Sequence, residues 1–524
     1  MDADAVVIGS GPNGLVAANL LADRGWEVVV VEAAGQPGGA VRTGEITVPG
    51  YRHDLFSSFY PLAAASRVIR GLQLEQYGLR WLRGPLVLAH PAEDGSCPVL
   101  GTFEETLASL DPGDRDGWTR MIRLWDEAGG AFMQGLTEPF PPVRATLRGV
   151  RRLGPSEALD FARFTALPLR RMTEEFGLGP RAARLLAGNA LHADFAPETP
   201  GSAVFGWTLV GLARSVGFPV PEGGAGALSE AMIRRLRQRG GVVLSGRPVE
   251  AIEVRDGRAA GVRTADGDRI GARRAVLADV GAPQLYGRLL DPRHVPASLL
   301  RRLERFQYDS STVKVDWALS APIPWAAADA RRAPVIHVAE SMDELTRSAA
   351  VAATHAVPAD PFLVMGQYSM IDPNRQPRGA ETAWAYTHVP QQIDGDERGR
   401  LTGRWDEADE QAMAERVEER IERLAPGFRA LIVGRHVFTP RTMELADRNL
   451  VGGAINGGTA QLHQQLVFRP AAGLRRAATP VPGLYLASAS AHPGGGVHGA
   501  CGANAARAAL SLRERGRRLI HSRR

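Results

Sequence analysis

The chain has 524 residues, which is too long for one ordinary domain and predicts two or three. Apolar residues make up 44% and charged residues 23%, a balance that excludes wholesale disorder. No window approaches the ~20 consecutive apolar residues of a membrane helix. Two cysteines, Cys97 and Cys501, exclude a disulfide framework and a cysteine zinc site. Because a strand-like run, Ala5 to Ile8, opens the chain without a basic leader, we expect a cytoplasmic protein.

Arginine supplies almost all of the positive charge. Lys+Arg total 62 against 57 Asp+Glu, and Lys314 is the single lysine. Arginines gather in residues 144–171 and 513–524, but without the interleaved aromatic residues or the known module that nucleic-acid binding favours. We therefore expect no nucleic-acid partner. The clusters are interpreted as solvated helix faces, with weak contact with an anionic membrane surface as the alternative.

The order of predicted elements indicates an α/β protein with a discontinuous Rossmann-like domain. Its three parts are residues 1–61, 217–299 and 475–524, in which strands alternate with helices and hairpin turns. Two insertions, 62–216 and 300–474, form a second domain for the substrate. The first insertion has helical spacing and the second mixes strands with helices, so this domain combines a mixed sheet with a helical layer.

The first motif lies between the first predicted strand and helix. It is a Gly-x-Gly-x-x-Gly turn made of Gly9, Ser10, Gly11, Pro12, Asn13 and Gly14. The next strand ends at Glu32, followed by Ala33, at the spacing of a dinucleotide-binding unit. The glycines allow a tight turn and a close approach to a pyrophosphate, and the helix N-terminus favours its negative charge. Glu32 can accept both hydrogen bonds from a ribose.

Two further glycine segments suit additional contacts with the same dinucleotide. Gly38-Gly39 followed by Arg42 suits a second contact with a pyrophosphate and a cation to neutralise it. Near the C-terminus, the strand at 484–487 runs into residues 489–499, which include His492-Pro493-Gly494, and then into a helix rich in small residues. A second helix N-terminus would therefore face the ligand.

These segments resemble the phytoene-dehydrogenase-related flavoproteins of the amine-oxidase-like FAD superfamily. Residues 221–228, 372–379 and 425–428 look like the same family, in its bacterial and mitochondrial branch. The resemblance implies FAD, and it places further positions at the cofactor: Val249, Ala489, Ser490, Gly496 and Val497. Ala489-Ser490 stand where an acidic residue is usual in the wider fold.

The expected function is FAD-dependent oxidation of an apolar organic substrate, such as a polyene or isoprenoid, at a carbon-carbon bond. Isomerisation is an alternative reaction, and a flavin amine oxidase or a non-catalytic lipid-escort protein of the same fold are alternative functions. No second nucleotide motif for NAD(P)H is seen, so electrons are expected to leave to oxygen or a quinone. No metal site is expected.

Two residues are candidates for catalysis. His498 lies in the loop expected over the flavin. Lys314 lies in a predicted strand, 310–319, on the face opposite Val313, Val315 and Trp317. In the amine-oxidase-like family a lysine in this strand holds a water against the flavin, so the resemblance implies a proton-handling role. A surface lysine at the edge of a sheet is the alternative interpretation.

Overall fold

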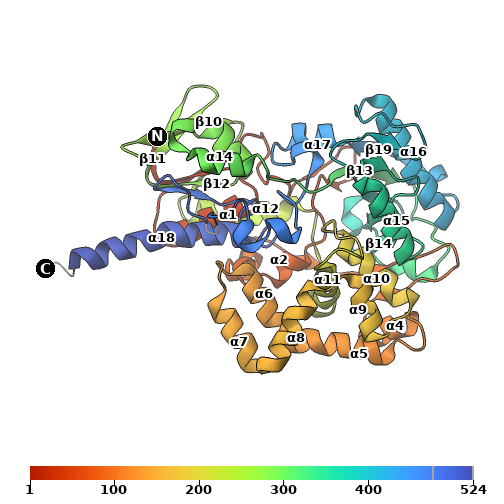
Figure 1. Cartoon of the computed structure of the whole chain (residues 1–524). Coiled ribbons are helices and arrows are strands. Elements are labelled where there is room, and N and C mark those ends of the chain that lie inside the picture. Colours follow the sequence, from red (N-terminus) through yellow and green to blue (C-terminus); the bar gives the residue numbers. More distant parts are fainter. Residues whose placement is uncertain (475–476, 522–524) are drawn as a thin grey trace.

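The computed structural model describes residues 1–474 and 477–521, with side chains as far as Ser511 (Figure 1). The predicted domain boundary at 475 and the side chains of the 513–524 arginine cluster lie outside these residues. Strands and helices are both abundant, and the predicted α/β class is confirmed.

The first sheet has a parallel centre and an antiparallel meander at one side. Its strands follow the order β10-β11-β12-β1-β2-β9, with β20 also paired to β12. Strands β9, β2, β1, β12 and β20 run parallel to their neighbours in this group. The carboxyl ends of parallel strands meet at one edge, where such sheets bind nucleotides. The strands are β1 (Asp2–Ile8), β2 (Val28–Val31), β9 (Val242–Leu244), β10 (Val249–Arg255), β11 (Arg258–Thr264), β12 (Arg269–Ala278) and β20 (Leu484–Leu486).

Three helices pack on this sheet, and their packing accounts for its apolar strands. Strand β2 is four valines, all buried, because helices and the meander cover both faces. Helix α1 (Pro12–Ala22) packs with α12 (Gly226–Gln238) and α18 (Ala500–His521) through small residues. A Cβ on Gly502 would lie 1.9 Å from the carbonyl oxygen of Asn13, so the starts of α1 and α18 are pressed together.

The second sheet is mixed and lies in the region predicted for the substrate domain. Its order is β19-β13-β17-β16-β14-β6-β7, antiparallel except for the β14–β6 pair. One face of β13, with Val313, Val315 and Trp317, packs with α16 (Glu407–Leu424). The strands are β6 (Leu88–Ala89), β7 (Val99–Leu100), β13 (Ser311–Leu319), β14 (Val335–Val338), β16 (Leu363–Gln367), β17 (Glu381–Val389) and β19 (Ile432–Phe438).

A helical layer built from the first insertion shares a core with the other face of this sheet. Figure 1 shows α5 to α8 at one edge of the molecule, away from the first sheet. Trp207 is buried at its centre against Trp125, Phe161 and Phe164. The helices are α4 (Phe103–Ser109), α5 (Arg115–Leu124), α6 (Gly130–Thr137), α7 (Val143–Leu153), α8 (Pro155–Ala166), α9 (Leu169–Phe176), α10 (Pro180–Leu191) and α11 (Ser202–Val216). Helix α15 (Met342–Ala353) packs beside α10.

Two connecting segments join the two sheets. Residues 43–60 form the short strands β3 (Thr43–Gly44) and β4 (His53–Asp54) between them. Helix α17 (Pro440–Ala446) and the residues after it reach the first sheet, where Asn449 Nδ2 donates to the carbonyl oxygen of Asp279 (3.0 Å). Residues assigned to the second domain therefore also contact the first, and the exact boundaries stay a prediction.

Within the part of the chain that the structure describes, no helix is both long enough and apolar enough to cross a membrane.

Candidate functional site

The turn between β1 and α1 is a cradle of backbone that excludes side chains. Gly9 has a φ of +89°, in the left-handed region that favours glycine. A Cβ on Gly14 would lie 2.3 Å from the carbonyl oxygen of Gly9. Gly11 is the N-cap of α1 and has no side chain of its own to cap the helix, and the first-turn amide of Gly14 donates to Asp279 Oδ2 (2.8 Å). This helix end therefore offers its positive dipole to an anionic ligand.

Glu32 lies beside this turn and orders it. Its Oε2 accepts hydrogen bonds from Ser10 N (2.8 Å) and Ser10 Oγ (2.6 Å), and its Oε1 accepts one from Ala34 N (2.8 Å). The residue is only 8% exposed, whereas the neighbouring Ala33 is exposed. Glu32 is thus placed to accept from a ribose, and it already supports the loop.

The second glycine pair packs directly on the first turn. A Cβ on Gly39 would lie 2.8 Å from the Cα of Gly11, and Gly38 N donates to Ser10 Oγ (2.9 Å). The Arg42 guanidinium donates to the carbonyl oxygens of Gly39 (2.7 Å) and Ala446 (2.9 Å). The structure therefore brings together two segments that the sequence analysis predicted separately for one pyrophosphate.

Val249 is also close to Glu32. It begins β10, and the residues before it run along the end of β2, because Gly246 N donates to the carbonyl oxygen of Ala34 and Arg247 N to that of Glu32. The backbone at Val249 therefore lies near the group predicted to hold the ribose.

The C-terminal segment completes this edge of the sheet. Gly496 has a φ of +97°, and Val497 packs with the core around α1 and α12. The carbonyl oxygen of Ala489 accepts from Arg469, and Ser490 Oγ donates to the carbonyl oxygen of Gly457 (2.9 Å). The two helix N-termini, of α1 and α18, thus meet at the predicted cofactor site.

His498 has a structural role in this loop. Its Nδ1 accepts from Ala500 N (3.0 Å) at the start of α18, and its carbonyl oxygen accepts from Ser66 Oγ (2.7 Å). Burial lowers the pKa of His498 to about 4, so the imidazole is neutral at neutral pH. A catalytic role for His498 stays a prediction.

Asp279 was missed by sequence reasoning. It follows β12, and its Oδ2 accepts from Gly14 N (2.8 Å), one of the amides at the start of α1. Burial raises the pKa of Asp279 to about 7, and the nearby Asp447 and Glu32 act in the same direction. The only sequence signal is an acidic residue directly after a buried strand, at the edge where ligands bind.

Lys314 is buried on β13, the strand next to the edge strand β19 of the second sheet. It is 2% exposed, and β13 lies between β17 and β19, so the surface-lysine interpretation is wrong. Its Nζ donates to the carbonyl oxygen of Asp54 (3.0 Å) and pairs closely with the Asp316 carboxylate. Burial lowers the pKa of Lys314, although Asp316 opposes this effect. The predicted alternation of side chains along this strand is confirmed.

Aromatic residues surround Lys314 on the same face. In the sheet register, Lys314 pairs with Tyr386 and Asp316 pairs with Trp384. The Trp384 and Tyr386 rings stack at 5.9 Å between centroids, and Lys314 Nζ lies 5.7 Å from the Trp384 ring. The lysine thus lies among largely buried aromatic rings as well as the charged groups that it bonds.

A buried cluster connects this face to the first sheet. Arg375 is fully buried and donates from Nη1 to Asp54 Oδ2 (2.8 Å) and from Nε to Asp372 Oδ2 (2.9 Å). Asp54 Oδ1 accepts from Ala225 N (2.7 Å) and Asp372 Oδ2 accepts from Gly223 N (2.8 Å). Burial alone would raise the pKa of Asp54, but Arg375 and the hydrogen bonds lower it overall. The cluster therefore fixes the glycine-rich stretch 221–226 between the two sheets.

Other buried histidines pair with neighbouring side chains. His192 Nε2 and His337 Nε2 lie 2.7 Å apart, and burial lowers the pKa of His192 to about 3. His53 lies 3.5 Å from Asp316, which links it to the Lys314 cluster. Among the residues described, no group of three or more His, Cys, Asp or Glu could hold a metal ion.

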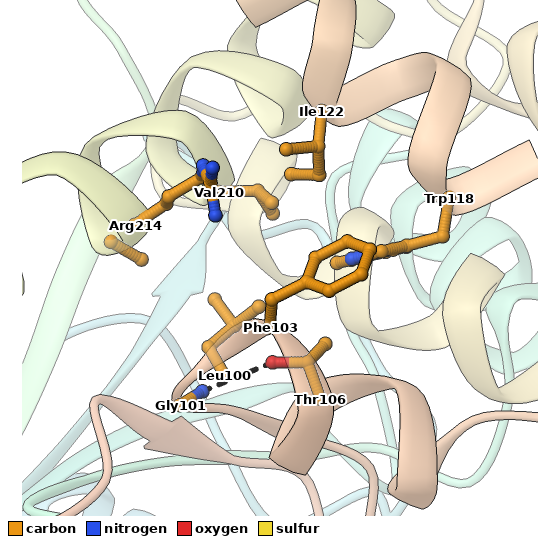
Figure 2. A pocket seen from close by; sticks show the side chains of 9 residues that line it. Leu100, Gly101, Phe103, Thr106, Trp118, Ile122, Val210 and Arg214 are labelled. Carbon is orange, nitrogen blue, oxygen red and sulfur yellow. Dashed lines mark hydrogen bonds between the residues drawn. The ribbon is translucent and has the colours of Figure 1, made fainter. Parts of the chain in front are cut away.

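Two cavities lie away from this site. Figure 2 shows one of about 20 Å³, lined by Leu100, Phe103, Trp118 and Val210, with Gly101 N bonded to Thr106 Oγ1. That volume suits one water-sized group, so it cannot hold an organic substrate. A surface groove of about 590 Å³ beside β10 is lined by charged residues. Neither includes Lys314 or the Gly9 turn.

Comparison with known proteins agrees with this geometry. The model of the family described as flavin containing amine oxidoreductase matches residues 13–510. The chain belongs to this family. It is therefore an oxidoreductase whose cofactor is FAD.

Similar proteins cover nearly the whole chain. Pyridine nucleotide-disulfide oxidoreductase domain-containing protein 2 of Mus musculus is 29% identical, over 96% of this chain and 92% of its own. Phytoene desaturase (neurosporene-forming) of Cereibacter sphaeroides is 26% identical, over 96% and 93%. An oxidoreductase structure from Methanosarcina mazei has a TM-score of 0.62 at 16% identity, covering 98% of this chain and 100% of that one. The predicted resemblance to phytoene-dehydrogenase-related flavoproteins is thus confirmed.

The residues present fit FAD. At Gly9, Gly11, Gly14 and Gly39 a Cβ would collide with neighbouring protein atoms, so only bare backbone fits in this turn. Two helix N-termini face the same edge, and Glu32 and Arg42 supply an acceptor and a cation beside it. These are the features that a dinucleotide with a negatively charged pyrophosphate requires.

Proposed function

We propose that this flavoprotein dehydrogenates an apolar organic substrate, such as a polyene or isoprenoid, at a carbon-carbon bond. FAD, when bound, accepts the hydride. The observation that supports the proposal is the buried aromatic face around Lys314, formed by Trp384, Tyr386 and Tyr368. Desaturases of carotenoids among the similar proteins favour the same substrate class.

We propose that the backbone cradle and its neighbours hold FAD. The contacts would come from Gly9, Ser10, Gly11, Pro12, Asn13, Gly14, Glu32, Ala33, Gly38, Gly39, Arg42, Val249, Ala489, Ser490, Gly496 and Val497. Support comes from their convergence on one edge of the first sheet. Asp279, which bonds the same loop, joins this set.

Lys314 would handle the proton that accompanies hydride loss. Burial lowers its pKa, which makes loss of a proton from the amine easier than in water, while Asp316 keeps its position. The Asp54 carbonyl oxygen fixes the direction of a second Nζ hydrogen. Arginine could not replace it, because its guanidinium stays protonated.

Anaerobic mixing with a panel of polyenes, amines and amino acids tests the substrate class. We expect flavin absorbance to bleach with a polyene and not with amines. Bleaching by an amine alone would favour a flavin amine oxidase. A flavin that no compound reduces would favour the lipid-escort alternative.

Replacement of Lys314 by methionine tests the proton-handling role. We expect Lys314→Met to keep FAD but to slow substrate oxidation, or reoxidation by oxygen or a quinone, by about 100-fold. Asp316→Asn is the matched variant: it retains the lysine but removes the group that raises its pKa, so the rise of rate with pH should shift to lower pH. Unchanged rates in flavin-replete Lys314→Met would show that Lys314 takes no part in the reaction.

A further inference from the structure

Helix α7 lies at the outer edge of the helical layer (Figure 1), and several of its apolar side chains are exposed. Val143 is 57% exposed, Leu147 53% and Val150 37%, whereas Ala145 is the buried residue that holds the helix to its neighbours. Such side chains normally face a core, so a whole row of them in water is unfavourable.

The same helix exposes positive charge without acidic residues. Its sequence, VRATLRGVRRL, includes Arg144, Arg148, Arg151 and Arg152, all exposed. The nearest ion pairs along the chain are those of Asp126 with Arg214 and of Arg163 with Glu175, and among the described residues none involves these four arginines. Arg152 bonds only a backbone carbonyl oxygen, that of Asp126 (3.2 Å).

The two kinds of side chain form adjacent rows. Val143, Leu147 and Val150 repeat at spacings of four and three residues, and Arg144, Arg148 and Arg151 repeat one residue later. At ~100° per residue, the arginine row lies about a quarter of a turn from the apolar row. Ala145 lies on the remaining side, toward the protein. This is the arrangement of a helix that lies in the headgroup region of a membrane.

A second exposed apolar segment lies near the loop of the cofactor site. Leu462, Leu466 and Phe468 are each 44–50% exposed. Arg469, directly after this segment, lies against Gly494, and the ring of Phe140, between α6 and α7, packs on His492 at 6.0 Å between centroids. Residues next to both exposed segments therefore contact the loop that we propose to bind FAD.

We propose that α7 docks the protein on an anionic lipid bilayer. The aliphatic row enters the boundary between headgroups and acyl chains, and the arginines bind lipid phosphates. Nucleic acid is disfavoured as the partner, since the exposed row is aliphatic and offers no aromatic ring for stacking bases. The docking does not depend on the substrate class, although an apolar substrate would be supplied from the same membrane.

The test is co-sedimentation of the full, flavin-loaded chain with lipid vesicles. We expect binding to vesicles with about 30% phosphatidylglycerol and much weaker binding to phosphatidylcholine alone, at an ionic strength of about 0.1 M. Arg144→Gln/Arg151→Gln should lower the partition coefficient by about tenfold or more. Val143→Ser/Leu147→Ser should lower it by about fivefold or more.

The matched control has the same change in net charge. Arg237→Gln/Arg347→Gln removes two exposed arginines from α12 and α15, and it should bind vesicles as the unchanged chain does. Flavin absorbance reports that every variant is folded. Three results would overturn the proposal: no binding by the unchanged chain, an equal loss in the control, or a loss of oligonucleotide binding in the α7 variants with vesicle binding intact.

Discussion

The cradle around Gly9 and the cluster around Lys314 are built in different ways. The cradle uses backbone atoms from residues close in sequence, and side chains are excluded from it. The Lys314 cluster uses charged side chains from distant segments, buried in one volume: Asp54 and Arg375 are 321 residues apart. An added side-chain atom in the cradle should therefore weaken ligand binding. Removal of one charged partner from the Lys314 cluster should instead lower the stability of the fold.

The largest expected effect comes from adding atoms to the cradle. Gly11→Val places a Cβ 2.7 Å from Asp279 Oδ2 and fills the space proposed for the pyrophosphate. We expect flavin occupancy to fall by about tenfold or more, because a helix end obstructed in this way cannot approach the phosphates. The ratio of flavin to protein absorbance after gel filtration measures it. Gly35→Ala is the control, since a Cβ there meets no atom within 4 Å. Full occupancy in Gly11→Val would contradict the proposed cofactor contacts.

The next effect tests the second type of site. Arg375→Met leaves Asp54 and Asp372 buried without their shared cation, which should lower the free energy of unfolding by about 3–5 kcal/mol. The exposed Arg378→Gln should change it by less than about 0.5 kcal/mol. Urea denaturation of the flavin-loaded proteins compares the two. Adding Asp54→Asn to Arg375→Met should recover part of the loss. Similar midpoints for the two single variants would mean that the cluster contributes little.

The smallest effect lies where the two kinds of site meet, at Asp279. Its pKa is raised from 3.8 to about 7, so the folded state holds a proton that the unfolded state releases between about pH 4 and 7. Stability should therefore fall as pH rises through this range and stay level above it. Asp279→Asn keeps an acceptor for Gly14 N–H and removes the ionisation. The free energy of unfolding of Asp279→Asn should equal that of the unchanged chain at about pH 4 and exceed it by about 2–4 kcal/mol at about pH 8. The urea midpoint of flavin release at several pH values measures this, and parallel profiles would refute the assignment.

Sequence reasoning gave its most detailed predictions where function depends on local spacing. Gly9 to Gly14, Glu32 and the Gly38-Gly39 pair could be predicted because a strand, a tight turn and a helix start lie within about thirty residues, and the ligand needs backbone atoms there. Alternation along residues 310–319 placed Lys314 on the correct face of its strand, since side chains on a strand repeat every two residues. Alternation did not show that the strand has a neighbour on each side and that its lysine is buried.

By itself, the sequence determined the FAD-binding α/β fold, the order of its segments and the backbone cradle. Only the tertiary structure decided which distant side chains meet: Asp279 with Gly14, Asp54 with Arg375, and Lys314 with the carbonyl oxygen of Asp54. The physical reason is that periodicity gives the face on which a residue lies, but not the element packed against that face. When such side chains are buried together, their pKa values shift or they form a strong ion pair, because the charged groups have lost their water.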